Sequence, residues 1–158
     1  MASLAFLAGA MSLASAAAES SRASAAATAP AAASPLGLWK TFDDKTGNAR
    51  AIVRIYQENG KLFGRIERSF TPGAEKRVCQ VCSDQRKNQP ILGLIIIRNM
   101  KSTDGEYGGG DILDPDSGSV YRCKFHVDDS GTHLIVRGFI GISLLGRTQT
   151  WQRVDALP

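Results

Sequence analysis

Turn-forming sequences recur at short intervals along this chain of 158 residues, and their spacing limits the folds open to it. Asn59-Gly60 and Asp104-Gly105 supply the positive φ angles that tight hairpin turns require. Further turns rich in Asp and Gly occur at 43–48, 114–118 and 128–131. No segment between them keeps a helical period over several turns. The spacing therefore predicts a meander of antiparallel strands.

β-Branched and aromatic residues fill the segments between the turns, as is typical of strands. Ser119–Val127 alternates strictly, with Tyr121, Cys123 and Phe125 on one face and charged or polar residues on the other. Such alternation indicates a half-buried strand. Ile91–Arg98 is a nearly continuous apolar run, which favours a central strand. The predicted strands are 36–42, 49–57, 61–68, 91–98, 106–113, 119–127, 132–140 and 147–154, with one short helical turn within 71–88.

These elements predict an all-β protein with a single closed antiparallel barrel. A barrel of about eight or nine strands encloses room for its own side chains or for one small ligand. Glycines inside the strands, such as Gly64, Gly93 and Gly138, fit sharp bends at barrel corners. The barrel domain is predicted to span residues 36–155.

The N-terminal part differs in composition from the rest. Residues 1–18 are apolar and small, and the stretch is too short to cross a membrane, which needs roughly 20 apolar residues. Ala16-Ala17-Ala18 forms a signal-type cleavage sequence, although no Lys or Arg precedes the apolar run. Residues 19–35 are interpreted as a disordered Ala/Ser/Pro linker with little to bury. We expect an exported protein with a signal peptide, periplasmic or secreted; the alternative is a low-complexity leader that is not a signal.

The charge pattern argues against a nucleic-acid partner. The net charge is +4 and aromatic residues make up 7% of the chain. A nucleic-acid-binding protein combines a continuous basic face with interleaved aromatic residues, and neither is present in the pattern. The basic segment 65–101 is interpreted as a solvated face, with peripheral contact to anionic lipid headgroups of the cell envelope as the alternative.

Cys79 and Cys82 form a C-x-x-C motif in a predicted loop. A redox motif of this type needs a βαβ context, and a tetrahedral zinc site needs two more ligands. Only Cys123, His126 and His133 could supply these ligands, and their spacing does not support it. We therefore predict a disulfide between Cys79 and Cys82, a free, buried Cys123 and no metal site.

The other polar groups have ordinary explanations. His126 and His133 flank a turn and could face each other across a hairpin, but no nucleophile motif accompanies them. The aspartates within 111–116 lack the twelve-residue calcium-binding loop. The glycines at 108–110 precede a strand, whereas a phosphate cradle precedes a helix. Neither a cofactor nor catalysis is expected.

Gly37-Leu38-Trp39 opens the first predicted strand, and the last carries Arg147, Gln149 and Trp151 on one face. This arrangement resembles the lipocalin and fatty-acid-binding (calycin) pattern, in which an arginine of the final strand packs over the tryptophan of a G-x-W motif. The resemblance implies that Trp39 lies near Arg147 or Trp151. Arginines within strands either face inward, where they could pair with a ligand carboxylate, or cover the solvent face with their stems. For Arg147 we expect an inward position.

A second set of motifs extends the similarity over nearly all of residues 37–153. These motifs are Val53–Tyr56, Gly60–Ile66, Cys79–Cys82, Pro90–Gly93, Gly110–Pro115, Val136–Gly141 and Gly146–Trp151. With them the chain resembles the small exported bacterial proteins of the domain-of-unknown-function family 2147. That resemblance implies a lipocalin-like barrel and a periplasmic setting, and it implies no established activity.

The sequence therefore predicts a non-catalytic binding module for a small apolar or amphiphilic ligand. The alternative is a structural or interaction barrel of the cell envelope whose interior is filled by its own side chains. A cavity above roughly 300 Å³ with a few convergent polar groups would favour ligand binding. The candidate ligand-binding or barrel-closing residues are Trp39, Tyr56, Arg137, Arg147, Gln149 and Trp151.

Overall fold

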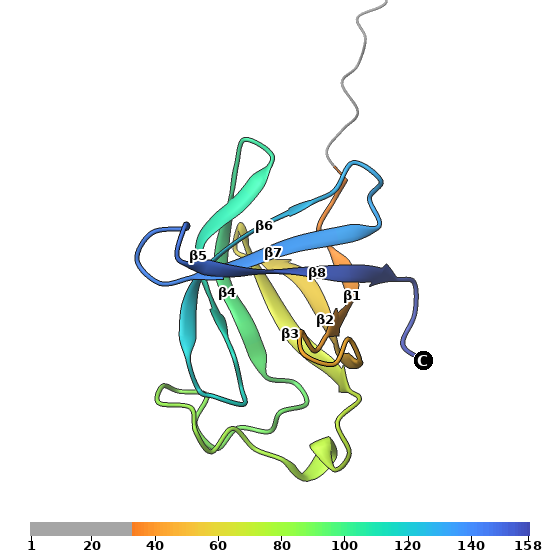
Figure 1. Ribbon diagram of the computed structural model, residues 1–158, viewed down its shortest axis with the longest axis vertical. Coiled ribbons are helices and arrows are strands. Elements are labelled where there is room, and N and C mark those ends of the chain that lie inside the picture. The colour runs from red at the N-terminus through yellow and green to blue at the C-terminus, as the bar shows by residue number, and fades with distance from the viewer. Residues whose placement is uncertain (1–32) are drawn as a thin grey trace, which may run out of the picture.

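Eight strands form one closed antiparallel barrel, in which each strand pairs with the next and the last pairs with the first (Figure 1). The computed structural model describes residues 33–158, so the predicted signal-like leader and nearly all of the predicted linker lie outside the described residues. The prediction of an all-β barrel is confirmed. The strands are β1 (Gly37–Phe42), β2 (Ala49–Glu58), β3 (Lys61–Ser69), β4 (Ile95–Thr103), β5 (Glu106–Leu113), β6 (Val120–Val127), β7 (His133–Phe139) and β8 (Gly146–Val154).

Tight turns in the left-handed region connect two of the hairpins. Asn59 and Gly60 join β2 to β3 with φ angles of 49° and 75°. Asp104 and Gly105 join β4 to β5 with φ angles of 47° and 85°. Positive φ at both central positions gives a twist that matches the flanking strands. The predicted bounds of every strand except β4 agree with the structure to within one residue, whereas β4 ends at Thr103 and not at Arg98 as predicted.

β4 begins at Ile95 rather than at Ile91, where we predicted its start. Ile91 and Leu94 are buried, but they belong to the preceding loop and pack into the core from there. Gly93 has a φ of 87° and donates its backbone N–H to the carbonyl of Ile66, which turns the chain before the strand starts. An apolar run without alternation could not separate these loop anchors from the strand.

Two glycines allow neighbouring strands to approach closely where the barrel bends. The β3–β4 register shifts on both sides of Gly64, and a Cβ atom there would meet the Ile97 side chain at 3.0 Å. The β5–β6 register shifts between Tyr107 and Gly110. A Cβ atom on Gly110 would overlap the carbonyl oxygen of Arg98. Larger residues at these two positions would force the strands apart, so glycine is needed here for space.

The two ends of the barrel differ. The connections β1–β2, β3–β4, β5–β6 and β7–β8 lie at one end, here called the open end, and the connections β2–β3, β4–β5 and β6–β7 lie at the closed end. Trp39 is fully buried near the closed end, and its Nε1 donates to the carbonyl of Pro35 at 2.8 Å. The largest buried side chains of the strands are Trp39, Val53, Ile52, Ile55, Ile97, Met100, Phe125, Leu134 and Trp151.

The chain packs onto the barrel slightly earlier than we predicted. Pro35 is fully buried, although the linker was predicted to extend through this residue. The Arg153 guanidinium donates to the carbonyls of Ser34, at 2.6 Å, and Leu36, at 3.0 Å. The ordered domain therefore includes Ser34 and Pro35. The contact depends on Arg153, which is distant in the sequence, so the composition of residues 19–35 did not predict it.

A long connection, residues 70–94, joins β3 to β4 below the strands in the view of Figure 1. It contains the short 3-10 helix η1 (Ala74–Lys76) and an isolated bridge between Val78 and Pro90. The predicted disulfide between Cys79 and Cys82 is present here, and both residues are buried. No helix within residues 33–158 has the length and apolar character that a membrane crossing requires.

A buried ionic network fixes this connection to the barrel wall. The Arg86 side chain is only 6% exposed, and its Nη2 lies 2.6 Å from an oxygen of Asp84. Arg98 of β4 contacts both Asp84 and Asp111 of β5, each at 3.2 Å. The hydrogen bond from Arg86 lowers the pKa of Asp84 to about 2. Because a buried guanidinium needs partners, these two carboxylates hold the connection in place.

Candidate functional site

A cavity of about 330 Å³ opens at the open end of the barrel. Residues of all eight strands line it, and most of them are apolar. Polar side chains are concentrated at the rim, where the connections between strands begin and end. The apolar wall includes Val53, Ile66, Ile96, Ile112, Val136 and Trp151.

Gly138 of β7 contributes to the volume of this cavity. It follows Val136 on the same face of the strand, and both residues line the cavity. A Cβ atom on Gly138 would lie 3.4 Å from Ile112 and 3.6 Å from Tyr121, which are ordinary contact distances. Glycine here is therefore not required for close strand packing, in contrast to Gly64. Its missing side chain leaves space inside the barrel.

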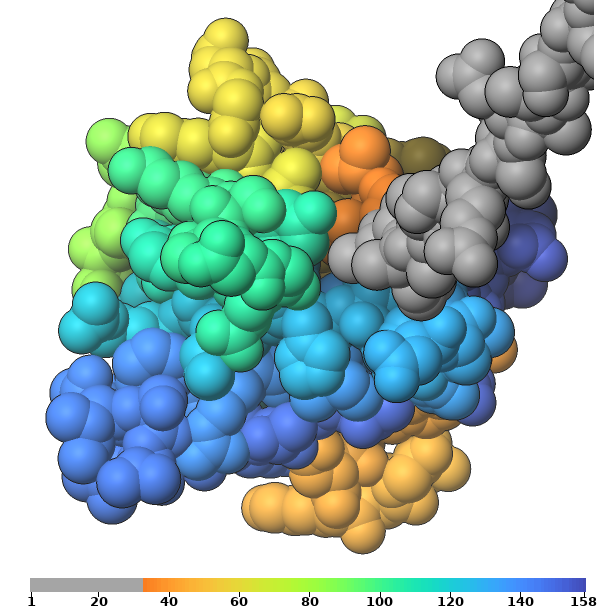
Figure 2. Space-filling model, turned by 90° about the horizontal axis from the view of Figure 1, so that it is seen from above, coloured from red at the N-terminus to blue at the C-terminus, as the bar shows by residue number. Residues whose placement is uncertain are grey.

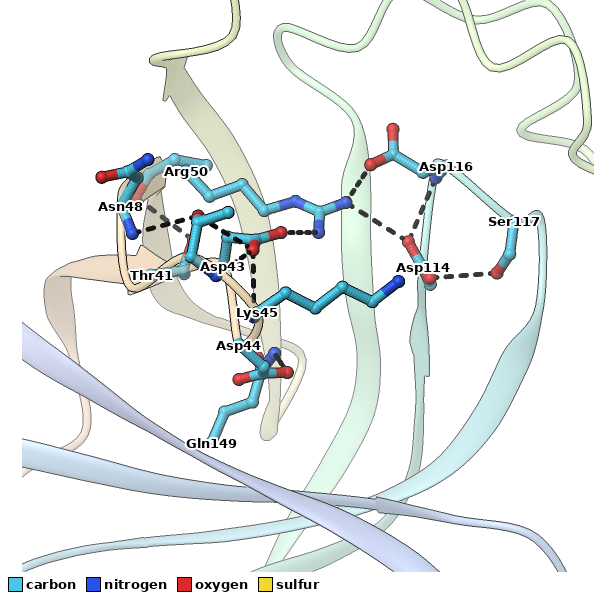
Figure 3. A network of polar contacts seen from close by, with 12 residues as sticks. Thr41, Asp43, Asp44, Lys45, Asn48, Arg50, Asp114, Asp116, Ser117 and Gln149 are labelled. Atoms are coloured by element: carbon cyan, nitrogen blue, oxygen red, sulfur yellow. Dashed lines mark hydrogen bonds and ion pairs between the residues drawn. The ribbon is translucent and has the colours of Figure 1, made fainter.

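Arg50 organises one side of the rim (Figure 3). Its guanidinium lies between Asp43 of the β1–β2 turn, at 3.8 Å, and Asp114 of the β5–β6 turn, at 3.5 Å. The same group pairs with Asp116, which also contacts Arg77 at 2.9 Å. Backbone hydrogen bonding from Thr46 lowers the pKa of Asp43. Arg50 thereby connects two turns that come from distant parts of the sequence.

A chain of polar contacts connects the other side of the rim to the cavity wall. Arg147 pairs with Asp44, which also accepts a hydrogen bond from the Gln149 side chain at 2.8 Å. The Gln149 carbonyl oxygen in turn accepts from Trp151 Nε1 at 3.0 Å. Arg147, Gln149 and Trp151 are alternate residues of β8 and all line the cavity. The indole N–H of the buried Trp151 is therefore satisfied from within the site.

The structure separates the six candidate residues into two groups. Arg147, Gln149 and Trp151 line the cavity. Trp39 lies at the closed end and does not line it. Tyr56 stacks on Phe63 at 5.8 Å between ring centroids, outside the cavity, and Arg137 bonds to the β7–β8 connection.

Of the two neighbours that we expected for Trp39, Arg147 or Trp151, Arg147 does not lie beside it. Arg153 occupies that position, with its guanidinium carbon 4.2 Å from the centre of the Trp39 ring. Trp39 and Arg153 are also direct partners across the β1–β8 pairing. Arg147 lies six residues earlier on β8, at the open end, where it pairs with Asp44. The register of β8 against β1 decides between the two arginines, and the sequence does not show that register.

The sequence analysis missed Asp44 and Arg50, which give the rim its polar character. Asp44 was interpreted only as part of a turn, and Arg50 only as part of a strand. Gly138 was interpreted as a bend, whereas it lines the cavity. A charged residue placed directly beside a turn was the one signal available for Arg50. It becomes informative only when the two turns are known to lie at the same end of the barrel.

The remaining polar candidates lie away from the cavity. His126 pairs with Ile135 across β6 and β7, so it does not face His133. His133 Nδ1 instead lies 3.0 Å from Asp128, beside the β6–β7 turn. Cys123 is free and buried, and burial raises the pKa of its thiol to about 12. Among residues 33–158, no three His, Cys, Asp or Glu side chains come together in a way that could hold a metal ion.

The closed eight-stranded barrel and its end-opening cavity define the lipocalin-like class of fold. Among solved structures, the chain is similar to the protein HP1028 from Helicobacter pylori, which is described as belonging to the lipocalin family. The TM-score is 0.66 with 17% sequence identity, over 76% of this chain and 82% of that chain. At this level of identity the likeness concerns the fold.

The chain belongs to the family described as "Uncharacterized protein conserved in bacteria (DUF2147)", whose model matches residues 37–153. The family resemblance found in the sequence motifs is thereby confirmed. No curated protein matches the sequence.

Proposed function

We propose that this protein is a non-catalytic binding module that holds a small apolar or amphiphilic ligand in its barrel. The observation that carries the proposal is the cavity of about 330 Å³ with apolar walls and a polar rim. Ligand pockets typically measure about 300–1,000 Å³ and combine apolar walls with a few polar groups. A barrel filled by its own side chains would leave no such space, so the cavity favours binding over the purely structural alternative.

The charges at the rim favour a ligand without a strong negative charge. Arg50 and Arg147 are the two arginines that line the cavity, and each already pairs with aspartate side chains. A ligand carboxylate would have to displace one of these partners. A ligand with a hydroxyl, ester or amide group could instead hydrogen-bond to Gln149 or to the rim aspartates, while its apolar part contacts the cavity wall. An amphiphile with an uncharged polar group fits this arrangement best.

Two features support the absence of catalysis and an extracytoplasmic location. The residues that line the cavity include no serine, cysteine or histidine, so the wall offers neither their nucleophiles nor an imidazole base. The disulfide between Cys79 and Cys82 is of the kind that persists in oxidising compartments. We therefore place the protein in the periplasm or outside the cell.

The proposal is tested by filling the cavity. Gly138→Leu places a side chain inside the barrel, and Gly108→Leu serves as the matched control, because a Cβ atom on Gly108 points toward Lys124 on the outer face. The probe is the uncharged fluorophore N-phenyl-1-naphthylamine, together with Trp151 emission, since this indole lines the cavity. We expect about tenfold weaker probe binding in Gly138→Leu and unchanged binding in Gly108→Leu.

Equal probe binding by both variants, with both folded by circular dichroism, would contradict a cavity site. Native mass spectrometry of protein purified from its own cell envelope gives an independent readout. A bound small molecule that is retained by Gly108→Leu and lost from Gly138→Leu would identify the ligand directly.

A further inference from the structure

The β7–β8 connection, residues 140–145, carries four large aliphatic side chains that face solvent. The exposed fractions are 67% for Ile140, 60% for Ile142, 81% for Leu144 and 70% for Leu145. This connection, here called the apolar loop, projects from the body of the barrel at its open end (Figures 1 and 2). Single exposed apolar residues are ordinary, but a contiguous group of this kind marks an interaction surface.

Hydrogen bonds hold the apolar loop in its projecting conformation. The backbone N–H of Ile140 donates to the Leu145 carbonyl at 3.2 Å. The Arg137 guanidinium donates to the carbonyls of Ser143, at 2.6 Å, and Leu144, at 3.3 Å. Because these carbonyls are satisfied, the loop does not need to fold back to bury its backbone. The aliphatic side chains of the loop therefore stay exposed to solvent.

Cationic groups without acidic partners stand beside the apolar loop. The four aspartates of the rim, at 43, 44, 114 and 116, all pair with arginines. Arg122 lies over the Phe139 ring at 5.8 Å, and neither Arg122 nor Arg137 has a carboxylate within ion-pair distance in the described part of the chain. The surface around the loop therefore combines aliphatic side chains with two guanidinium groups that form no ion pair within the described residues.

We propose that the apolar loop docks the barrel on an anionic lipid bilayer, with the cavity mouth toward the membrane. Aliphatic side chains insert at the boundary between headgroups and acyl chains, and guanidinium groups are attracted to anionic headgroups. Ile140 and Leu145 also line the cavity, so the docked loop connects the membrane with the cavity. This docking surface goes beyond ligand binding, because Ile142 and Leu144 are exposed and do not line the cavity.

The experiment uses flotation with phosphatidylcholine vesicles, prepared with and without phosphatidylglycerol. The test variant is Ile142→Ser with Leu144→Ser, because neither residue lines the cavity. The matched control is Leu36→Ser with Leu157→Ser, which removes two exposed aliphatic side chains beside the closed-end termini of β1 and β8. We expect the unchanged protein and the control to float with anionic vesicles, and the test variant to bind about tenfold more weakly.

A charge test separates attraction to anionic headgroups from nonspecific hydrophobic adsorption to the vesicles. Arg122→Gln should weaken binding to anionic vesicles several-fold, whereas Lys101→Gln, at the closed end, should leave it unchanged. Failure of the unchanged protein to float, or equal flotation of test variant and control, would overturn the docking proposal. So would a dimer that the test variant converts to a monomer, since the loop would then contact a second copy. Probe binding in the cavity by the test variant reports separately on the ligand proposal.

Discussion

The guanidinium of Arg153 lies over the indole of Trp39, with its carbon atom 4.2 Å from the ring centre. The two residues face each other across the β1–β8 pairing. The same guanidinium donates to the carbonyls of Gly131, Ser34 and Leu36. One side chain therefore joins the first strand, the last strand, the β6–β7 turn and the segment that precedes the barrel.

This contact predicts a coupled loss of stability. Trp39→Ala removes a fully buried indole and should cost about 3–5 kcal/mol of unfolding free energy. Arg153→Ala removes the stacked cation and its hydrogen bonds and should cost about 1–3 kcal/mol. The double variant should cost about 0.5–2 kcal/mol less than the sum, because both changes remove the same contact. Urea denaturation of the four proteins measures the coupling.

Arg147→Ala provides the control for this cycle. Arg147 lies on the same strand but at the open end, paired with Asp44. The losses of unfolding free energy from Arg147→Ala and Trp39→Ala should be additive within about 0.5 kcal/mol. Coupling of Trp39 to Arg147 and not to Arg153 would contradict the register of β8 described here.

Ser34 and Pro35 are predicted to belong to the stable domain. A chain that begins at Leu36 loses the buried Pro35 ring, the acceptor of the Trp39 indole N–H and the Ser34 carbonyl. A buried donor left without its acceptor costs about 1–3 kcal/mol. Thermal unfolding should therefore occur several degrees lower for this chain than for one that begins at Ala33. Equal midpoints would show that the two residues add nothing to the fold.

The Cys123 thiol predicts an alkaline loss of stability. Burial, with a smaller effect from Asp111, raises the pKa of this thiol from 9.0 to about 12. The unfolded chain therefore loses the thiol proton at a lower pH than the folded barrel does. Stability should fall as the pH rises from about 9 toward 12. Cys123→Ala should lose less stability than the unchanged protein over this range, as measured by urea titrations at each pH.

Asp84 predicts the opposite dependence at acid pH. The hydrogen bond from Arg86 lowers the pKa of Asp84 from 3.8 to about 2. The contribution of Asp84 is therefore complete above about pH 4 and is lost as the pH falls toward 2. Asp84→Asn should cost about 1–3 kcal/mol at neutral pH, because the buried Arg86 then keeps only its longer contacts with Asp111 and the Ile95 carbonyl.

The difference in unfolding free energy between Asp84→Asn and the unchanged protein should become smaller as the pH is lowered. Asp129→Asn, at an exposed turn, is the matched control. Its unfolding free energy should stay within about 0.5 kcal/mol of that of the unchanged protein at every pH. A gap that stays constant down to pH 2 would show that the carboxylate charge of Asp84 does not stabilise the fold.

Much of the barrel could be predicted because its turns are local. Asn59-Gly60 specifies a tight hairpin through the backbone freedom of two adjacent residues, and alternation in Ser119–Val127 specifies which face is buried. The start of β4 was not predictable in this way, because Ile91 and Leu94 are buried without belonging to a strand. Local patterns report burial and turn geometry, and they do not separate a buried loop from a strand.

The site was less predictable because it depends on register. Arg147 and Arg153 are both strand arginines with similar neighbours, and only the pairing of β8 with β1 sends one to the cavity rim and the other over Trp39. Arg50 and Asp114 meet because two distant turns share the open end. Such contacts follow from closure of the barrel, and short sequence motifs do not predict them.

The β1–β8 seam has a consequence for the lifetime of the folded state. Every other pairing joins strands that are consecutive in the chain, whereas this seam joins the two ends of the barrel sequence. Loop-closure entropy opposes such a contact until the intervening hairpins have formed. The seam should therefore form after the folding transition state, so Trp39→Ala should accelerate unfolding in stopped-flow urea jumps and leave the folding rate nearly unchanged. A matching drop in the folding rate would instead place the seam in the nucleus. Late closure of this kind means that the tryptophan and arginine at the seam govern how long the protein stays folded rather than how fast it folds.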